Sequence, residues 1–387
     1  MNSSLSSAAN RLLVPVVGML LLVSGCGPKD GVKEYADGMA AYELRNLEKA
    51  GKLFAKCLVY APENVDALVM LARVQCDRGE IAEAGRTIER ASALASDVPD
   101  VALLDAEIAF YAKDYKRAVA RFSSVAENAK LGAEERSRGW TGLGIVEMTC
   151  DRRDFARIAF LRAIRLDNRN AAAHYHLGLL YRGDTFGYLN AARDEFKIFV
   201  RLGEKADSRA LHAQRVIIPG IDDDIARRKA ARPGASRRDS NAASAALERA
   251  LAAWKKNDFK TARREYEAAY KADVLSAPAA LGLAQAWAKT DASAAGLQKS
   301  LDYYKEACAL NPGSIKTLLT AGDLAAKLGQ HATAAELYSR AVAADPANIT
   351  AIDGLIRALR KTGSQEAKDV ANAYQRYRDA VTVRKAK

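Results

Sequence analysis

Five cysteines and four histidines are the residues of this sequence best suited to nucleophilic or metal chemistry. Their spacing contains no CxxC pair and no HExxH helix, and the sequence has no glycine-rich phosphate loop. His174 and His176 are two residues apart, so they point to different faces of a helix and do not form a metal pair. The consecutive aspartates Asp222–Asp224 lack the alternation of a calcium-binding loop. The sequence therefore predicts no enzyme and no metal site, and it indicates no cofactor.

Cys26 differs from the other cysteines in what precedes it. One basic residue, Arg11, is followed by an uncharged and mostly apolar run over 12–23, and the string ends Leu-Val-Ser-Gly-Cys at Cys26. The run is far shorter than the ~20 apolar residues that a membrane-spanning helix needs. It therefore predicts an export signal.

This string resembles the lipobox of bacterial lipoproteins. In that family a small residue, here Gly25, precedes a cysteine that is lipidated and becomes the new N-terminus. The resemblance implies that residues 1–25 are a signal peptide, that Cys26 carries acyl chains and that residues 26–30 tether the protein to a membrane. Gly27 stands where enterobacterial lipoproteins can carry an aspartate as an inner-membrane retention signal, so the resemblance implies the periplasmic face of the outer membrane. An ordinary signal peptide with a cysteine there by chance is the alternative.

The composition favours helices and an anionic partner. Alanine is abundant, proline is scarce and aromatic residues make up 7% of the chain, which favours closely packed helices over a sheet. The net charge is +12 with a pI near 9.4. An exported protein does not meet the chromosome, so we expect no nucleic acid, and anionic lipids, cell-wall polymers or acidic proteins are the candidates. A generally basic, solvated surface is the alternative.

A period of 34 residues runs through the sequence. Small residues recur at this spacing in two series: Gly38, Ala72 and Ala106, and Ala50, Ala84 and Ala118. Large apolar residues recur in the same way at Phe54, Ile88 and Phe122. The motif Trp140-x2-Leu143-Gly144 returns 34 residues later as His174-x2-Leu177-Gly178, so core packing explains His174. Such self-similarity predicts a repeat architecture in which each unit packs on its neighbours.

The pattern resembles the tetratricopeptide repeat, a helix-turn-helix unit of this length. The resemblance implies an all-α fold, a right-handed superhelical solenoid of such units in two blocks. Within a unit we expect the small residues of the two helices, such as Gly144 and Ala156, to face each other, with a large residue four positions on filling the space beyond. Glycines at the turns and prolines after the second helices are expected at Gly79, Gly329, Pro62, Pro312 and Pro346.

Breaks in the repeat divide the mature chain. We predict about five units over 31–203, and three units plus atypical C-terminal helices over 243–387. The segment between, 204–242, reads as a capping helix and a basic linker that contains Arg237 and Arg238 and is flexible from about 231 to 244. This linker is either an anion-binding segment or a solvated spacer. We expect the remaining cysteines to be unpaired thiols, with Cys57 in the core.

The tetratricopeptide family typically binds peptides or helices of partner proteins in a groove lined by the first helices. Counted from the small residue, the groove positions of the first block are mostly apolar: Tyr35, Met39, Tyr42, Val69, Arg73, Cys76, Leu103, Glu107, Phe110, Thr141, Ile145, Met148, Tyr175, Leu179 and Arg182. An exposed apolar strip is typical of a binding site, although a register error would place some of these residues in the core. The second block has a more polar lining, with Lys316, Asp323, Arg357 and Arg360.

Two classes of function fit these features. The first is a membrane-anchored scaffold that binds envelope proteins or their peptide segments and helps to assemble or regulate cell-envelope machinery. The second is a protein that binds anionic cell-wall or lipid polymers directly through its basic surface.

Overall fold

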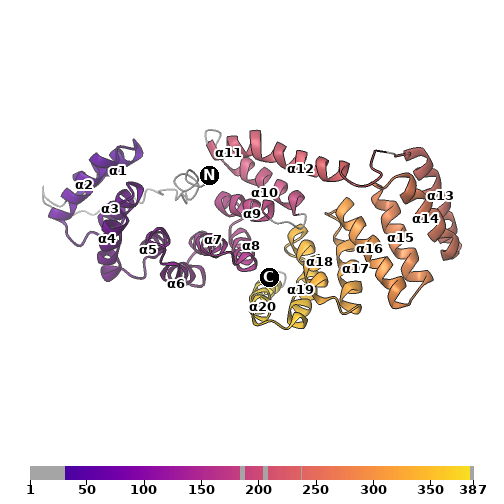
Figure 1. The fold of residues 1–387 in the computed structure, drawn as a ribbon. Coiled ribbons are helices and arrows are strands. Elements are labelled where there is room, and N and C mark those ends of the chain that lie inside the picture. Colours follow the sequence, from indigo (N-terminus) through magenta and orange to yellow (C-terminus); the bar gives the residue numbers. More distant parts are fainter. Residues whose placement is uncertain (1–30, 184–187, 204–207, 237, 384–387) are drawn as a thin grey trace. The chain divides into compact units, whose positions relative to one another are not determined.

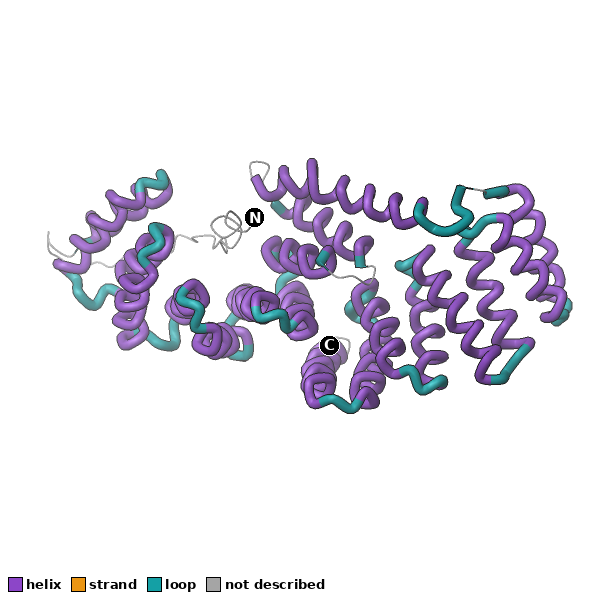
Figure 2. Tube along the Cα trace, in the orientation of Figure 1, coloured by secondary structure: helices purple, strands orange, loops and turns teal. Residues whose placement is uncertain are grey.

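The computed structural model describes residues 31–183, 188–203, 208–236 and 238–383, and these are helical with short connecting turns (Figure 1, Figure 2). The described residues contain no strand. The chain divides into two compact units with the boundary between Ala173 and His174. The predicted all-α fold of helix-turn-helix units is confirmed.

Unit 1 consists of four helix pairs. Their bounds are α1 Val32–Glu43, α2 Leu47–Tyr60, α3 Val65–Asp77, α4 Ile81–Leu94, α5 Pro99–Tyr111, α6 Tyr115–Ala126, α7 Ala133–Thr149 and α8 Arg153–Leu166. Each helix packs mainly on the helix before it and the helix after it, and the first helices α3, α5 and α7 also contact one another in sequence. This is the contact pattern of a solenoid.

Unit 2 holds the fifth pair, a long connecting helix and four further pairs. Their bounds are α9 Ala171–Arg182, α10 Leu189–Leu202, α11 Ser208–His212, the π-helical turn η1 Ala213–Ile217, α12 Ile218–Ala230, α13 Ser240–Lys255, α14 Phe259–Ala272, α15 Ala277–Thr290, α16 Ala294–Leu310, α17 Ile315–Lys327, α18 His331–Ala344, α19 Ile349–Thr362 and α20 Gln365–Val383. Helix α9 begins three residues before the unit boundary.

Glycines in the first helices admit aromatic rings from the second helices. A Cβ atom on Gly144 would lie 2.5 Å from the ring of Phe160, and one on Gly38 would lie 2.8 Å from Phe54. The expected role of the small residue is therefore confirmed, but the group nearest to Gly144 is the ring of Phe160 rather than Ala156. The ring four residues further along the second helix reaches back and fills the space that glycine leaves.

A second set of glycines, two positions before the first set, accommodates the preceding repeat. A Cβ atom on Gly142 would lie 2.2 Å from Phe122, which belongs to the previous pair, and Gly282 stands in the same relation to Tyr266 at 2.2 Å. Two glycines in one helix thus let it approach both of its neighbours. Sequence reasoning identified only one of the two positions.

Turns and helix ends follow the predicted residues. Gly79 and Gly329 have φ values of 81° and 74°, in the left-handed region that glycine adopts without strain. Helices α2, α16 and α18 each end two residues before a proline, as expected for Pro62, Pro312 and Pro346. These positions set the repeat boundaries correctly.

The segment between the repeat blocks is more ordered than we predicted. Residues 208–230 are one helical stretch, and its π-helical turn precedes Pro219, which has no backbone N–H to donate and crowds the preceding turn. Asp222–Asp224 lie within α12. Helix α13 already begins at Ser240, and Arg238 Nε donates to Asp273 Oδ1 at 2.9 Å. Arg232 also pairs with Glu306 of α16. The expectation of a flexible linker is wrong for residues 240–244, which are helical, and Arg232 and Arg238 pair with carboxylates on the helices that follow.

Among the described residues, no helix is both long enough and apolar enough to span a bilayer. Cys26, the predicted signal peptide and the tether lie outside the described residues.

Candidate functional site

The first helices of unit 1 expose a mixed apolar and polar surface, which we call the first-helix face. Its members are predicted groove residues that remain partly accessible: Tyr35, Met39, Tyr42, Val69, Arg73, Cys76, Glu107, Phe110 and Met148. They come from α1, α3, α5 and α7. Because α3 contacts α5 and α5 contacts α7, these residues follow one another along the unit.

Three further predicted groove residues of unit 1 are buried, so that part of the prediction is wrong. Leu103 is only 1% exposed and belongs to a core cluster with Phe122 and Leu143. Thr141 donates to the backbone oxygen of Ser137 and accepts from Asn170 at 2.9 Å each. Ile145 lies in α7, where every residue of Gly139–Glu147 is buried. The position counted from the small residue is therefore not exposed in this helix.

Polar side chains on this face pair with one another between successive first helices. Tyr42 of α1 donates to Asp77 of α3 at 2.9 Å. Arg73 of α3 lies 3.6 Å from Glu107 of α5, and both side chains are less than a fifth exposed. One helix further on, Arg138 of α7 donates to Asp100 of α5 at 2.9 Å. The two charged members of the face, Arg73 and Glu107, therefore balance each other, and charged residues beside the face are paired as well.

Burial shifts the pKa values of Tyr42 and Glu107 on this face. Burial, with the nearby carboxylate of Asp77, raises the pKa of the Tyr42 hydroxyl to about 12, so it stays a hydrogen-bond donor. Burial also raises the pKa of Glu107, against the attraction of Arg73 and Arg138. The uncharged form of Glu107 is consequently favoured over that of an exposed glutamate.

The apolar members of the face are anchored on one side by the core. Tyr35 lies with its ring 5.7 Å from that of Phe54, and it packs with Met39 and Tyr42 against a core cluster formed by α1, α2 and α3. Phe110 contacts Tyr115 with ring centroids 5.9 Å apart. Side chains held in this way lose little conformational freedom when a partner covers their exposed side.

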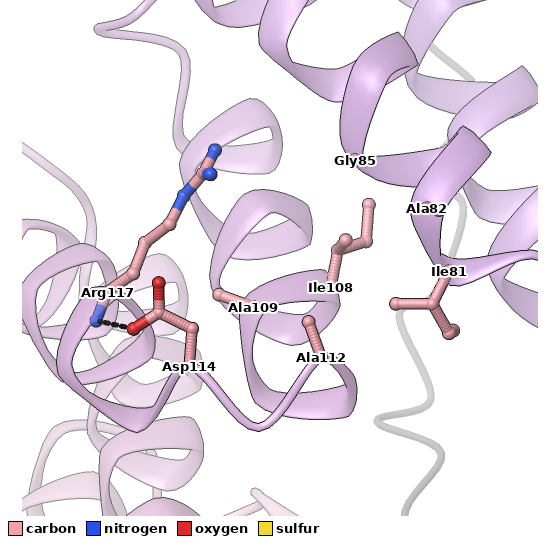
Figure 3. Close-up of a pocket in the computed structure, with 8 residues that line it drawn as sticks. All are labelled: Ile81, Ala82, Gly85, Ile108, Ala109, Ala112, Asp114 and Arg117. Carbon is pink, nitrogen blue, oxygen red and sulfur yellow. Dashed lines mark hydrogen bonds between the residues drawn. The ribbon is translucent and has the colours of Figure 1, made fainter.

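An apolar recess of about 390 Å³ lies elsewhere in unit 1 (Figure 3). Its walls come from α4 and from the region where α5 meets α6: Ile81, Ala82, Gly85, Ile108, Ala109, Ala112, Asp114 and Arg117. A Cβ atom on Gly85 would have no neighbour within 4 Å, so the recess is open above this residue. None of the residues predicted for a site lines this recess; the available signal was the pair of small residues Ala82 and Gly85, one turn apart on α4.

The predicted groove residues of unit 2 are only partly accessible. Tyr175 is 9% exposed because its ring packs 4.9 Å from Phe199 of α10, so it is a core residue. Leu179 is half-buried and Arg182 is exposed. The predicted polar lining of α17 and α19 is exposed, at Lys316, Asp323, Arg357 and Arg360.

Two histidines of α9 are buried, as core packing of His174 predicted. His174 Nδ1 lies 2.6 Å from Glu195 of α10. Burial, together with the charge of Arg209, lowers the pKa of His176 to about 4. The described residues contain no group of histidine, cysteine and carboxylate side chains arranged to hold a metal ion.

Similar folds occur among solved structures. PilF of Pseudomonas aeruginosa is 20% identical, covers 52% of this chain and 93% of its own, and has a TM-score of 0.42. MamA of Desulfovibrio magneticus is 18% identical, covers 48% of this chain and all of its own, with a TM-score of 0.38. The Cut9–Hcn1 structure is 14% identical, covers 91% of this chain and 79% of its own, with a TM-score of 0.37. No curated protein matches the chain significantly.

Three segments match family models that are each described as a tetratricopeptide repeat. They cover residues 41–108, 247–315 and 315–348, so both units contain at least one. The first match spans α2 to α4 and most of α5, and the other two run from α13 to α18. Helix pairs of the predicted period, glycines that admit aromatic rings and these three matches together show that both units contain tetratricopeptide repeats.

Proposed function

We propose that this chain is a membrane-anchored scaffold of the bacterial cell envelope whose first-helix face binds a segment of a partner protein. The repeats support a protein-interaction scaffold. Membrane attachment through Cys26 and a role in envelope machinery are our extension of that support. Binding rather than catalysis is the proposed activity.

The observation that carries the proposal is the charge balance of the first-helix face. Arg73 and Glu107 are less than a fifth exposed and face each other, so neither needs a charged group from outside. Around them Met39, Val69 and Phe110 remain partly accessible. A neutral face with apolar side chains fits an apolar or amphipathic segment, as in helix-in-groove recognition.

The face is tested by removing two of its apolar contacts. Met39→Ala combined with Phe110→Ala should weaken binding of the partner by about 2 kcal/mol or more, because large apolar side chains carry most of such binding. The measurement is capture of a discrete partner from detergent-solubilised membranes, followed by titration of that purified partner.

The matched control makes the same kind of change on the second helices. Val59→Ala combined with Leu94→Ala removes apolar side chains that are 75% and 47% exposed, and it should leave binding unchanged. Equal weakening by both double variants would contradict the proposed site. Circular dichroism should show unchanged helix content, and Met39→Lys repeats the test without truncating Phe110.

The anchor is tested separately. Cys26→Ser removes the thiol that lipidation requires, so it should abolish acyl labelling and release or misprocess the protein. Fractionation of labelled cells measures both effects. Unchanged lipid labelling together with unchanged membrane retention would rule out the anchor but would leave the binding face untouched.

Gly27 gives the outer membrane as the proposed destination, since the retention aspartate is missing at that position. Density-gradient separation of the two membranes checks this. The wild-type protein should fractionate with the outer membrane, and Gly27→Asp should shift it towards the inner membrane if the enterobacterial sorting rule applies.

A further inference from the structure

The first helices of the four pairs from α13 to α20 all end in basic residues. Their last turns contain Lys255 in α13, Lys289 in α15, Lys327 in α17, and Arg360 and Lys361 in α19. All five side chains belong to exposed residues. The first helices of unit 1, in contrast, have no basic residue in their last turns.

These cations lie along one edge of unit 2. The helices from α13 to α20 stack in chain order, each in contact with the next, so the C-terminal ends of successive first helices fall on the same side (Figure 1). Three more lysines lie at the same helix ends. Lys256 is the C-cap of α13, Lys260 lies in the first turn of α14, and Lys299 lies in the second turn of α16. We call this row of helix ends the turn edge.

The cations of the turn edge form no close ion pair with a carboxylate among the described residues. None of the basic residues just named forms an ion pair there, although ion pairs are frequent elsewhere in the chain. The same turns contain Asp258 and Asp291, which accept the backbone N–H groups of Thr261 and Ser293 at 3.1 and 3.0 Å and whose charges also act on Lys260 and Lys299. Three further carboxylates, Glu336, Glu366 and Asp369, lie within the first six residues of α18 and α20. The eight basic residues just named outnumber these five carboxylates, so the edge keeps a net positive charge.

An aromatic side chain holds one of these cations, Lys299, and the neighbouring Arg263 of α14 in place. Lys299 Nζ lies 4.5 Å from the ring centre of Trp287, and the guanidinium carbon of Arg263 lies 4.3 Å from it. Arg263 is fixed further by donating to Thr290 Oγ1 at 2.9 Å. Because cations already cover the indole of Trp287, this ring does not serve as a stacking platform for a sugar or a base. The arrangement presents positive charge, not an aromatic surface.

Compensation of the helix dipole does not account for the row. A cation near a helix C-terminus stabilises the helix. The corresponding turns of unit 1 also contain basic residues, but there Arg45, Arg78 and Arg152 pair with Asp77, Glu80 and Glu147. The cations named in unit 2 form no such pairs among the described residues, so their repetition over four consecutive helix pairs calls for a different explanation.

We propose that the turn edge docks onto an anionic lipid surface. Most of its cations are lysines. A lysine is a flexible point charge that binds wherever negative charge is dense, whereas the planar guanidinium of arginine recognises the geometry of a single carboxylate or phosphate. They are exposed in a row, which suits a continuous charged surface better than a single carboxylate. Each lysine at an anionic bilayer strengthens attachment about fivefold. The proposal uses residues of unit 2 only, so it does not depend on the first-helix face of unit 1.

An acidic protein segment is the competing occupant, and a binding experiment separates the two. The full-length chain with Cys26→Ser is mixed with vesicles of phosphatidylglycerol and phosphatidylcholine, or of phosphatidylcholine alone, and sedimented. The ratio of the two partition coefficients isolates the electrostatic contribution, because apolar contacts of the leader sequence are common to both vesicles. Soluble polyglutamate is then added as a competitor.

The edge variant combines Lys255→Gln, Lys256→Gln, Lys289→Gln and Lys327→Gln. It should lower the ratio at least about 30-fold. The control variant changes four exposed lysines of unit 1 in the same way, Lys33, Lys49, Lys116 and Lys130, and should lower the ratio less than about twofold. Circular dichroism checks that both variants keep their helix content.

Three results would overturn the proposal. The first is a ratio near one for the unmodified chain, which would mean that it does not distinguish anionic from neutral lipid. The second is an equal fall in the edge and control variants, which would mean that only net charge matters. The third is binding to polyglutamate that depends on the edge lysines while binding to anionic vesicles does not, which would assign the edge to an acidic protein.

Discussion

Along unit 1, charged side chains of successive first helices pair with one another, whereas along unit 2 the first helices end in cations that form no close ion pair with a carboxylate among the described residues. Arg73 and Glu107 exemplify the first arrangement, and Lys289 and Lys327 the second. Both units use the same helix-pair scaffold and the same glycine-to-ring packing. The difference therefore lies in surface side chains that the fold leaves free to vary.

This contrast suggests a division of labour between the two units. A face whose charges are internally balanced loses little electrostatic solvation when an apolar partner covers it. A row of unbalanced cations gains most from an anionic partner and weakens as salt is added. Unit 1 is thus suited to recognition by shape and apolar contact, and unit 2 to attachment by charge.

The shared scaffold makes the largest and most symmetrical prediction. Gly142→Ala in unit 1 and Gly282→Ala in unit 2 each place a methyl group 2.2 Å from an aromatic ring, on Phe122 and Tyr266 respectively. Each change should destabilise its own unit by about 2–3 kcal/mol, since overpacking a dense core forces shifts of side chains and backbone. Urea denaturation followed by peptide-resolved hydrogen exchange measures the two units separately.

Gly85→Ala is the control for this pair. Its added methyl group would meet no atom within 4 Å, so only helix propensity remains and the change should stabilise unit 1 by up to about 1 kcal/mol. If Gly142→Ala and Gly282→Ala were as harmless as Gly85→Ala, the units would not share the tight glycine contact.

Acidification should affect two buried groups, Glu107 of unit 1 and His176 of unit 2, in opposite directions. In unit 1, burial raises the pKa of Glu107 above its value in the unfolded chain, so the folded state binds more protons just above pH 4.5 and gains stability as the pH falls. In unit 2, the pKa of His176 is lowered to about 4 from 6.5, so the folded state binds fewer protons between those values. Unit 2 should lose about 2 kcal/mol of stability between pH 7 and pH 5 from this histidine.

The variants Glu107→Gln and His176→Gln check these contributions one at a time. Each should flatten the pH dependence of its own unit and leave the other unit unchanged, as measured by the urea midpoint of protected peptides from α5 and α9 at pH 5 and pH 7. A pH dependence of unit 2 that is the same with and without His176 would show that this side chain can be hydrated when protonated.

Local rules in the sequence predicted much of the fold. Gly79 and Gly329 form turns because only residues that tolerate positive φ suit that position, and Pro62 and Pro346 follow helix ends because proline cannot continue the hydrogen-bond ladder. The period of 34 residues also predicted where the small residues of the first and second helices lie. Such a residue depends on one contact within its own helix pair, so the sequence of one repeat is enough to identify it.

Surface exposure could not be read in the same way. Leu103, Ile145 and Tyr175 occupy groove positions by count, yet they are buried, because exposure depends on how tightly each first helix packs against its neighbours. The pairing of Arg73 with Glu107 depends on the rotation between two successive first helices, which no local motif encodes. Lys255 and Lys289 were visible as charges, but their common edge appears only once the helices are stacked.

The smallest predicted effect concerns the turn edge itself. If its lysines serve attachment and not folding, then Lys255→Gln, Lys289→Gln and Lys327→Gln together should change the free energy of unfolding of unit 2 by less than about 1 kcal/mol, since each side chain is exposed and lacks an ion-pair partner. Thermal and urea denaturation at low and high salt measure the change. A loss well above this value would show that the lysines stabilise the helix ends. The charges of unit 2 would then serve the fold, as the paired charges of unit 1 do, and the contrast between the two units would disappear. A small loss combined with strongly reduced binding to anionic vesicles would instead separate the two roles, because the same residues would then matter for attachment and not for the fold.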